Sequence, residues 1–325
     1  MENKLIVSTS PHLHSGARTE RIMLDVLIAL TPATVAAVVL FGLKALLLIA
    51  VSVGTAVLSE FVFNLIVKKK QTVGDLSAAV TGLLLALTLP ATTAWWQVMI
   101  GAIFAIVIVK CMFGGLGCNF ANPAITARIM MLISFSNEVA GGPATNFGTL
   151  TEGTAANGTL VTGATPLYAL GAGVSTDSLP SLLDMLLGNR GGAIGEGCII
   201  ALLIGGAYLL VRRVISWHTP VVLIGVSFLL SLAFSQSATV AVYHLLSGGL
   251  ILAAFFMATD YATTPINKLG KVVFAAGCAI ITVFIRFFGS YPEGISYAIL
   301  LMNILSPYIE KLCARKPLGA GGKSV

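Results

Sequence analysis

The sequence predicts an all-α polytopic membrane protein of about ten transmembrane helices, arranged as two inverted five-helix repeats with some helices broken. Three observations support this fold class. The chain is strongly apolar, its apolar residues fall into separate segments of roughly membrane-spanning length, and one segment of the first half resembles one in the second half.

Composition places the protein in lipid. Hydrophobic residues make up 57% of the 325-residue chain and charged residues 10%, against about 25% charged residues in an ordinary soluble domain. A soluble protein of this length could not bury so much apolar surface. The net charge of +6 does not indicate a nucleic-acid partner, because the basic residues form short clusters between apolar runs, as topology signals do.

The apolar segments give the order of the expected helices. They cover residues 22–41, 45–67, 76–90, 96–113, 120–135, 194–211, 220–234, 240–258, 272–288 and 295–310. Several are shorter than the ~20 residues that a straight span needs. Short spans predict broken or re-entrant helices whose irregular backbone faces protein or a cavity.

Lys and Arg in the connections predict which side each segment faces. Both ends of the chain and the connections with Lys68–Lys70, Lys110, Arg212–Arg213 and Lys268–Lys271 are expected to be cytoplasmic. The stretch 136–189 contains no Lys or Arg and is therefore expected outside. The predicted parts are a cytoplasmic segment 1–21, a first membrane repeat 22–135, an extracytoplasmic loop 136–193, a second membrane repeat 194–310 and a cytoplasmic tail 311–325.

An internal similarity supports the repeat. "LSAAVTGLLLALTLPATT" (76–93) resembles "LSGGLILAAFFMATDYATT" (246–264), which has one extra residue. If the third and eighth helices correspond, each repeat holds five helices. An odd number of helices makes the two copies point in opposite directions, as in many transport proteins.

The tetrapeptide "TGAT" (162–165) lies in the loop expected outside. Thr165 precedes Pro166, so its backbone is extended or in a turn and its hydroxyl is displayed. Gly163 and Ala164 remove bulk from the approach to that hydroxyl. The combination suits attachment of a large planar group such as a flavin phosphate, while the alternative is a simple turn in a linker.

Four segments together resemble the NqrB/RnfD family over essentially the whole chain. They are the tetrapeptide, "GGLGCNFANPAITAR" (114–128), "FFMATDYATTP" (255–265) and the N-terminal "SPHLHSGARTERIMLDVLIAL" (10–30). The absence of a long N-terminal extension favours the RnfD branch, which belongs to the ion-translocating ferredoxin:NAD oxidoreductase (Rnf) complex, over the NqrB branch of sodium-pumping NADH:quinone reductase.

This resemblance implies a membrane electron-transfer subunit of a redox-driven ion translocase in the prokaryotic cell (inner) membrane. It implies FMN joined through its phosphate to Thr165, with Thr162, Gly163 and Ala164 as the recognition frame for an exported flavin transferase. It also implies Rnf subunits A, B, C, E and G as partners, coupling of electron flow between ferredoxin and NAD to movement of Na⁺ or H⁺, and room for a second, non-covalent flavin such as riboflavin.

A second polar cluster is the candidate for that second flavin or for an ion. Asp260, Thr263 and Thr264 follow a predicted span and precede Pro265, so oxygen atoms gather where a helix breaks. The alternative is that Asp260 caps a helix or pairs with Lys268 or Lys271.

Asn122 and Arg128 belong to the same candidate site. Asn122-Pro123-Ala124 matches the tripeptide of aquaporin pores, but only one copy is present, and helix initiation by Asn122 and Pro123 is the favoured interpretation. Arg128 falls inside the fifth span and needs a carboxylate, a carbonyl or a phosphate as partner. The carboxylates Asp25 and Glu60 also lie in apolar runs and are weaker candidates.

No metal site is predicted. The five cysteines form no CxxC pair, and the four histidines are scattered, so packed, inert thiols are favoured over a metal or cluster site. Two hypotheses of other classes remain: a solute channel or transporter without flavin, built on the same broken repeats, and a purely structural subunit.

Overall fold

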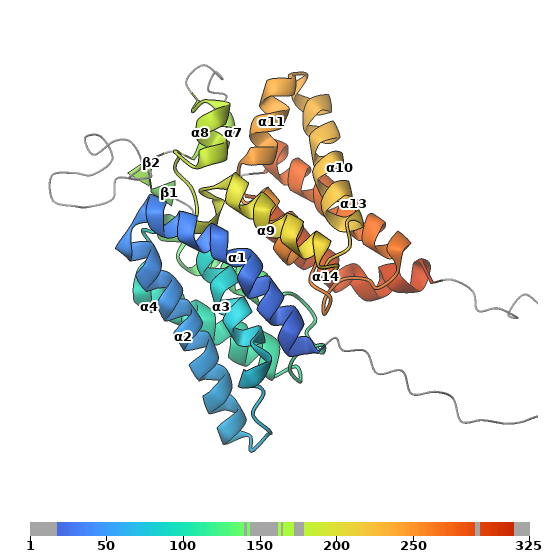
Figure 1. Cartoon of the computed structure of the whole chain (residues 1–325). Helices are drawn as coiled ribbons and strands as arrows, with labels where there is room; N and C mark the ends of the chain where they lie inside the picture. Colours follow the sequence, from blue (N-terminus) through green and yellow to red (C-terminus); the bar gives the residue numbers. More distant parts are fainter. Residues whose placement is uncertain are drawn as a thin grey trace, which may run out of the picture.

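The computed structural model describes residues 18–139, 142–143, 162–163, 165–171, 179–289 and 293–314. Helices dominate these ranges (Figure 1). The only strands within them are β1 (Gly142–Pro143) and β2 (Thr162–Gly163), a two-residue antiparallel pair. The fold is therefore all-helical in substance, as the sequence predicts.

The first half of the chain contains the following elements: α1 (Thr19–Phe41), α2 (Leu43–Ile66), the 3₁₀ turn η1 (Val73–Asp75), α3 (Ser77–Thr88), α4 (Trp95–Ile103), the π-helix η2 (Phe104–Cys111), α5 (Pro123–Ser134) and α6 (Ser136–Val139). Three short elements follow: α7 (Pro166–Gly171), α8 (Leu182–Leu187) and the 3₁₀ turn η4 (Ile194–Glu196). The second half contains α9 (Ile199–Val211), α10 (His218–Ser235), α11 (Ala238–Leu246), α12 (Leu250–Leu252), the π-helix η5 (Ala253–Met257), α13 (Lys268–Phe288) and α14 (Ile295–Leu312).

Each predicted apolar segment is largely helical, but few helices are full-length spans. Four described helices, α1, α2, α10 and α13, are long and apolar enough to cross a membrane. Taken together, as a fifth span broken in its middle or as a re-entrant loop, the pair Ala238–Leu246 and Leu250–Met257 is also long and apolar enough, with a bend of 64°. The protein is thus a multi-pass helical membrane protein, whereas ten crossings remain a prediction. The segment expected to begin at residue 194 begins as a 3₁₀ turn, and its α-helix starts only at Ile199.

The bend between these two helices has a local cause. Gly248 and Gly249 have φ values of +69° and +65°, in the left-handed region that glycine adopts without steric cost. Carbonyl groups at the end of α11 therefore lose their helical partners, and the chain restarts as α12 and η5. Such a break is tolerated at membrane depth only where protein supplies new partners.

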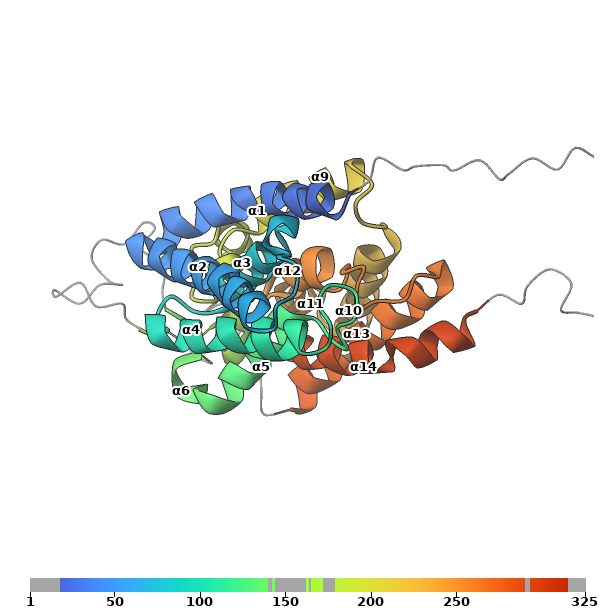
Figure 2. The ribbon, with the colours of Figure 1, turned by 90° about the horizontal axis from the view of Figure 1, so that it is seen from below.

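Close helix packing depends on small residues. α1 packs against α9, α2 against α3, and α10 against α13; the first pair lies side by side in both views (Figures 1 and 2). At the α1–α9 contact, a Cβ added to Gly205 would lie 2.1 Å from the carbonyl oxygen of Ala29. A side chain at this position would push the two helices apart.

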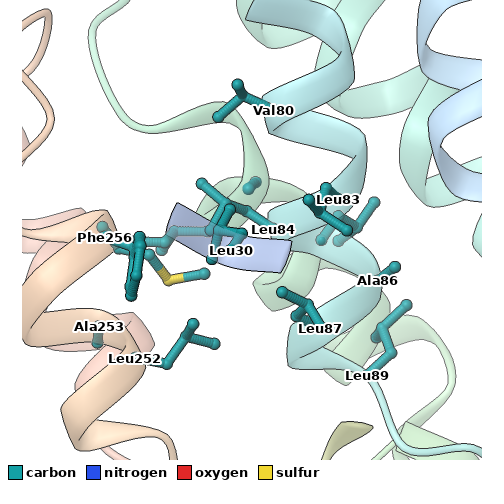
Figure 3. Packing of buried hydrophobic residues seen from close by; sticks show 14 of the residues in the cluster. Leu30, Val80, Leu83, Leu84, Ala86, Leu87, Leu89, Leu252, Ala253 and Phe256 are labelled. Carbon is teal, nitrogen blue, oxygen red and sulfur yellow. The ribbon is translucent and has the colours of Figure 1, made fainter. Parts of the chain in front are cut away.

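The core is a layer of aliphatic and aromatic side chains around α3. Leu83, Leu84 and Leu87 of α3 are buried, and Figure 3 shows this helix beside Leu30 of α1 and facing Phe256 of η5. Eleven of the twelve residues of α3 are buried. This helix is therefore enclosed by its neighbours on nearly all sides.

The described chain has two distinct ends. α1 begins at one end of the molecule, and α7, α8 and the β1–β2 pair lie at the other (Figure 1). The sequence places these two ends on opposite sides of the membrane, and the arrangement is compatible with that expectation.

Substitution of Gly205 by alanine should weaken the α1–α9 contact. Because the nearest atom is a backbone oxygen that cannot rotate away, overpacking should cost about 1–3 kcal/mol and lower the midpoint of thermal unfolding in detergent. The control is Gly225→Ala in α10, where the added Cβ meets nothing within 4 Å. Alanine is the better helix former by about 1 kcal/mol, so the control should be stable or slightly stabilised. Equal midpoints for the two variants would contradict the packing.

Candidate functional sites at two ends of the molecule

One cavity contains Asp260 and is called here the Asp260 pocket. Its lining atoms surround about 740 Å³ of space that is partly open to solvent. Its apolar walls include Ile22, Met23, Val26, Val80, Leu84, Leu209, Phe255 and Phe256. Its polar lining consists of Ser77, Thr81, Lys110, Asn119, Asn122, Thr259 and Asp260. Ile22 stands near the start of α1, so the pocket lies at that end of the molecule.

Asp260 sits in the turn that follows η5. Its carboxylate accepts hydrogen bonds from the backbone N–H of Ala262 and from Thr263 Oγ1, both at 3.1 Å. Thr264 Oγ1 donates to the backbone oxygen of Asp260 at 2.6 Å. Burial raises the pKa of Asp260 above its ordinary value. Thr263 and Thr264 thus hold the turn and do not line the pocket, and Asp260 itself faces the cavity.

The alternatives for Asp260 can be compared with these contacts. The described ion pairs do not join it to Lys268 or Lys271. The N-cap position of α13 is Asn267, so Asp260 does not cap that helix. It caps its own turn instead.

Two asparagines line the same pocket as Asp260. Asn122 caps α5, because its Oδ1 accepts from the backbone N–H groups of Ala124 at 3.0 Å and Ile125 at 3.5 Å, and Pro123 is the first helical residue. Asn119 is also buried, and its Oδ1 has no partner among the described residues. A buried acceptor without a partner on a cavity wall indicates a ligand with a hydrogen-bond donor.

Lys110 has a role that sequence reasoning missed. We expected it at the cytoplasmic edge of a loop, yet its side chain is 2% exposed and lies in η2. Its Nζ donates to Glu60 Oε1 at 2.8 Å and to Ser77 Oγ at 2.6 Å. The hydroxyl of Thr72 donates to the same Glu60 oxygen at 2.7 Å. This buried network closes one wall of the Asp260 pocket.

The second cavity contains Thr165 and is called here the Thr165 pocket. Its lining atoms surround about 230 Å³ of space that is partly open to solvent, and they belong to Thr165, Pro166, Leu167, Arg190, Gly191, Glu196, Ser247, Gly248 and Glu293. Thr165 is half-buried and directly precedes α7. Thr162 and Gly163 form β2, and Ala164 lies outside the described residues. The tetrapeptide therefore leads into a polar cavity at the α7–α8 end of the molecule.

Arg128 does not join the other candidates for the second site. It forms an ion pair with Glu293, just before α14, and Glu293 lines the Thr165 pocket. α5 accordingly begins at the Asp260 pocket with Asn122 and reaches the region of the Thr165 pocket at Arg128. The partner that the sequence left unidentified is a carboxylate.

The remaining carboxylate candidate, Asp25, also has partners. Its Oδ1 accepts from Tyr208 at 3.0 Å and from the exposed Arg212 at 3.2 Å. This pairing ties α1 to the end of α9. Among the described residues, no group of three or more His, Cys, Asp or Glu side chains could hold a metal ion, and the five cysteines form no disulfide.

The chain matches the model of the NQR2, RnfD, RnfE family over residues 6–319. The chain belongs to this family.

Members of the NQR2, RnfD, RnfE family resemble the chain along nearly its whole length. The D subunit of the Na⁺-translocating ferredoxin:NAD⁺ oxidoreductase complex of Acetobacterium woodii is 45% identical over 320 residues, with 98% of this chain and 96% of that protein covered. The D subunit of the proton-translocating ferredoxin:NAD⁺ oxidoreductase complex of Clostridium ljungdahlii is 38% identical, with 95% of each chain covered. The D subunit of the ion-translocating oxidoreductase complex of Halorhodospira halophila is 36% identical, with 95% of this chain and 96% of that protein covered.

Substitution of Lys110 by methionine should destabilise the protein strongly. The change leaves the Glu60 carboxylate buried without a cation, a situation that costs about 3–5 kcal/mol. The double variant with Glu60→Gln should recover much of this loss, because both charges are then removed. Unfolding in detergent micelles measures both effects, and the same substitution at the exposed Lys44 serves as the control. A double variant no more stable than Lys110→Met would show that the unpaired charge of Glu60 is not the cause of the lost stability.

Proposed function

We propose that the chain is the D subunit of an Rnf-type complex and carries electrons through FMN covalently bound to Thr165. The complex would couple electron flow between ferredoxin and NAD to ion translocation. The observation that carries this proposal is the position of Thr165, on a polar pocket with a buried arginine at the end of the molecule opposite the start of α1. The names of the relatives and their coverage of the whole chain support it.

The residues of the Thr165 pocket fit a phosphate ester. The pocket offers the Thr165 side chain beside Arg190, whose Nε has no partner among the described residues. The pocket is too small to hold a flavin, so only the phosphate end on Thr165 would face it and the flavin ring would lie outside it. When bound, FMN supplies one-electron transfer, and the protein supplies position and electrostatics.

The Asp260 pocket is our proposed site for a second, non-covalent flavin such as riboflavin. Its apolar walls suit a flat ring system, and the orphan Oδ1 of Asn119 is an acceptor for a ring or ribityl donor. Asp260 and Asn122 stand on the same cavity. No ion-pair partner of Asp260 competes for the pocket within the described ranges.

The inverted ten-helix repeat is part of the proposal. α1 and α9, the first helices of the two proposed repeats, pack against each other, and so do the fifth helices, α5 and α14. Contacts between equivalent helices are expected around a pseudo-two-fold axis. We place both chain ends in the cytoplasm and the loop with Thr165 outside, where an exported flavin transferase reaches it.

The proposed partners follow from this placement. They are Rnf subunits A, B, C, E and G, the flavin transferase and membrane lipid, with Na⁺ or H⁺ as the ion, since two of the relatives are named for different ions. The rival within the family is an NqrB-type subunit acting with NADH and quinone. A solute channel would conduct solute in liposomes without flavin, and a structural subunit would show neither property.

Loss of the Thr165 hydroxyl should abolish covalent flavin. The protein co-expressed with its flavin transferase is expected to show an FMN-sized mass addition and in-gel flavin fluorescence, and Thr165→Ala should show neither. Thr162→Ser is the matched control and should keep both signals. Fluorescence that survives Thr165→Ala would refute the attachment site.

Filling the Asp260 pocket should remove the second flavin and leave the first in place. Val80→Trp puts an indole into the cavity and should lower riboflavin released on denaturation at least tenfold, a change that corresponds to about 1.4 kcal/mol. The control is Val35→Trp, at a position of α1 that is 57% exposed. The mass addition at Thr165 reports that each variant is folded. Unchanged riboflavin in Val80→Trp would place the second flavin elsewhere.

A further inference from the structure

The Thr165 pocket is surrounded by more buried positive charge than negative charge. Arg128, Arg190 and Arg286 are 4%, 6% and 7% exposed. Glu196 and Glu293 are the carboxylates that line the pocket. These three guanidinium groups and two carboxylates leave one positive charge between them, and Arg190 is the one of the three arginines that lines the pocket. Burying such a charge without a counter-ion is costly.

Arg128 and Arg286 each have strong contacts of their own, although the Nε of each, like that of Arg190, has no partner among the described residues. Arg128 is paired with Glu293. Arg286 donates to the backbone oxygens of His244, Ser247 and Gly248, the latter two at 2.9 and 3.3 Å. These carbonyls are left over by the break after α11, where the negative end of a helix dipole attracts a cation. A Cβ on Gly248 would lie 2.7 Å from Arg286 Nη2, so the glycine makes this contact sterically feasible.

Arg190 is the third buried arginine at the Thr165 pocket. Its Nη2 donates to the backbone oxygen of Glu196 at 2.9 Å, and its Nη1 lies 3.5 Å from Ser247 Oγ. It forms no ion pair with any described carboxylate, Glu196 included. Burial lowers the pKa of Arg190, and the charge of Glu196 opposes this effect only in part. The guanidinium lines the pocket with its Nε unpartnered.

We propose that Arg190 is the counter-ion of the phosphate ester on Thr165. This inference rests on the proposed function and assigns the residue that holds the phosphate. In the attachment step, the Thr165 hydroxyl oxygen forms the new bond to the FMN phosphorus of FAD. The pyrophosphate bond breaks, AMP leaves and the hydroxyl proton passes to solvent. The product is a diester with a single negative charge, which balances the excess charge of the pocket.

The proposal predicts that the effect of Arg190 changes sign on flavinylation. Without flavin, Arg190→Gln removes a buried charge that Glu196 compensates only in part, so the variant should unfold at the same temperature as the parent protein or higher. With flavin, the parent protein should unfold at a higher temperature than its unmodified form, and Arg190→Gln should lose this gain. Arg190→Lys, which keeps the charge, should retain at least half of the gain.

The experiment compares thermal unfolding of the full-length protein in detergent, made with and without the flavin transferase. Intact mass gives the modified fraction of each sample. In the Thr165→Val background, the transferase should have no effect and Arg190→Gln should behave alike in both preparations. Arg21→Gln, at an exposed arginine of α1, is the matched surface control and should keep the full gain.

The possible results distinguish failure of the proposed role of Arg190 from failure of the proposed FMN attachment to Thr165. Absence of the mass addition in the parent protein defeats the proposed function. Presence of the addition, with an equal gain in the parent protein and in Arg190→Gln, overturns the role of Arg190 alone. Failure of Arg190→Gln to fold even without flavin also overturns it, because the proposal holds that the unpaired charge is a burden in that state.

Discussion

Charged side chains and the free backbone groups of broken helices are not hydrated inside a membrane. Each of them therefore needs an ion-pair or hydrogen-bond partner within the protein. This constraint explains the main polar contacts of the structure. Glu60 meets Lys110, Arg128 meets Glu293, and the carbonyls exposed by the break after α11 meet Arg286. Each contact joins elements far apart in sequence. The polar residues thereby fix how the apolar helices are placed, which a uniformly apolar surface cannot do.

One broken helix contributes to both pockets. Gly248 of the break lines the Thr165 pocket, and the helix that restarts after the break ends at Met257, shortly before Asp260. This restarted helix, α12 and η5, packs into the core. The same interruption of the helix therefore supplies backbone oxygens at one end and leads to a buried carboxylate at the other. The two sites are held in register by a single segment of chain.

The sequence predicted the helices and proposed Thr165 as an attachment residue, but it did not predict the side-chain pairs. Apolar runs and the Asn-Pro start of α5 are local signals, so they could be read directly. The partners Lys110 and Glu60 are 50 residues apart, and Arg128 and Glu293 are 165 apart. Helical periodicity gave no help, because in lipid both faces of a helix are apolar. Arg190 belongs to the stretch 136–193 that was expected to be an extracytoplasmic loop, and nothing local in the sequence marks it as buried.

The aliphatic layer along α3 has an electrical consequence. This helix has 12 residues and is about 18 Å long. Its Val80 and Leu84 line the Asp260 pocket. At its other end, the backbone oxygen of Leu89 accepts a hydrogen bond from the N–H of Ile194, in the same 3₁₀ turn as Glu196. The side chains shown in Figure 3 are apolar. A sodium ion or a proton placed there would lose its hydration with no ligand in exchange, at a cost of several kcal/mol. The layer would therefore act as an electrical insulator toward ions between the Asp260 pocket and the Thr165 pocket.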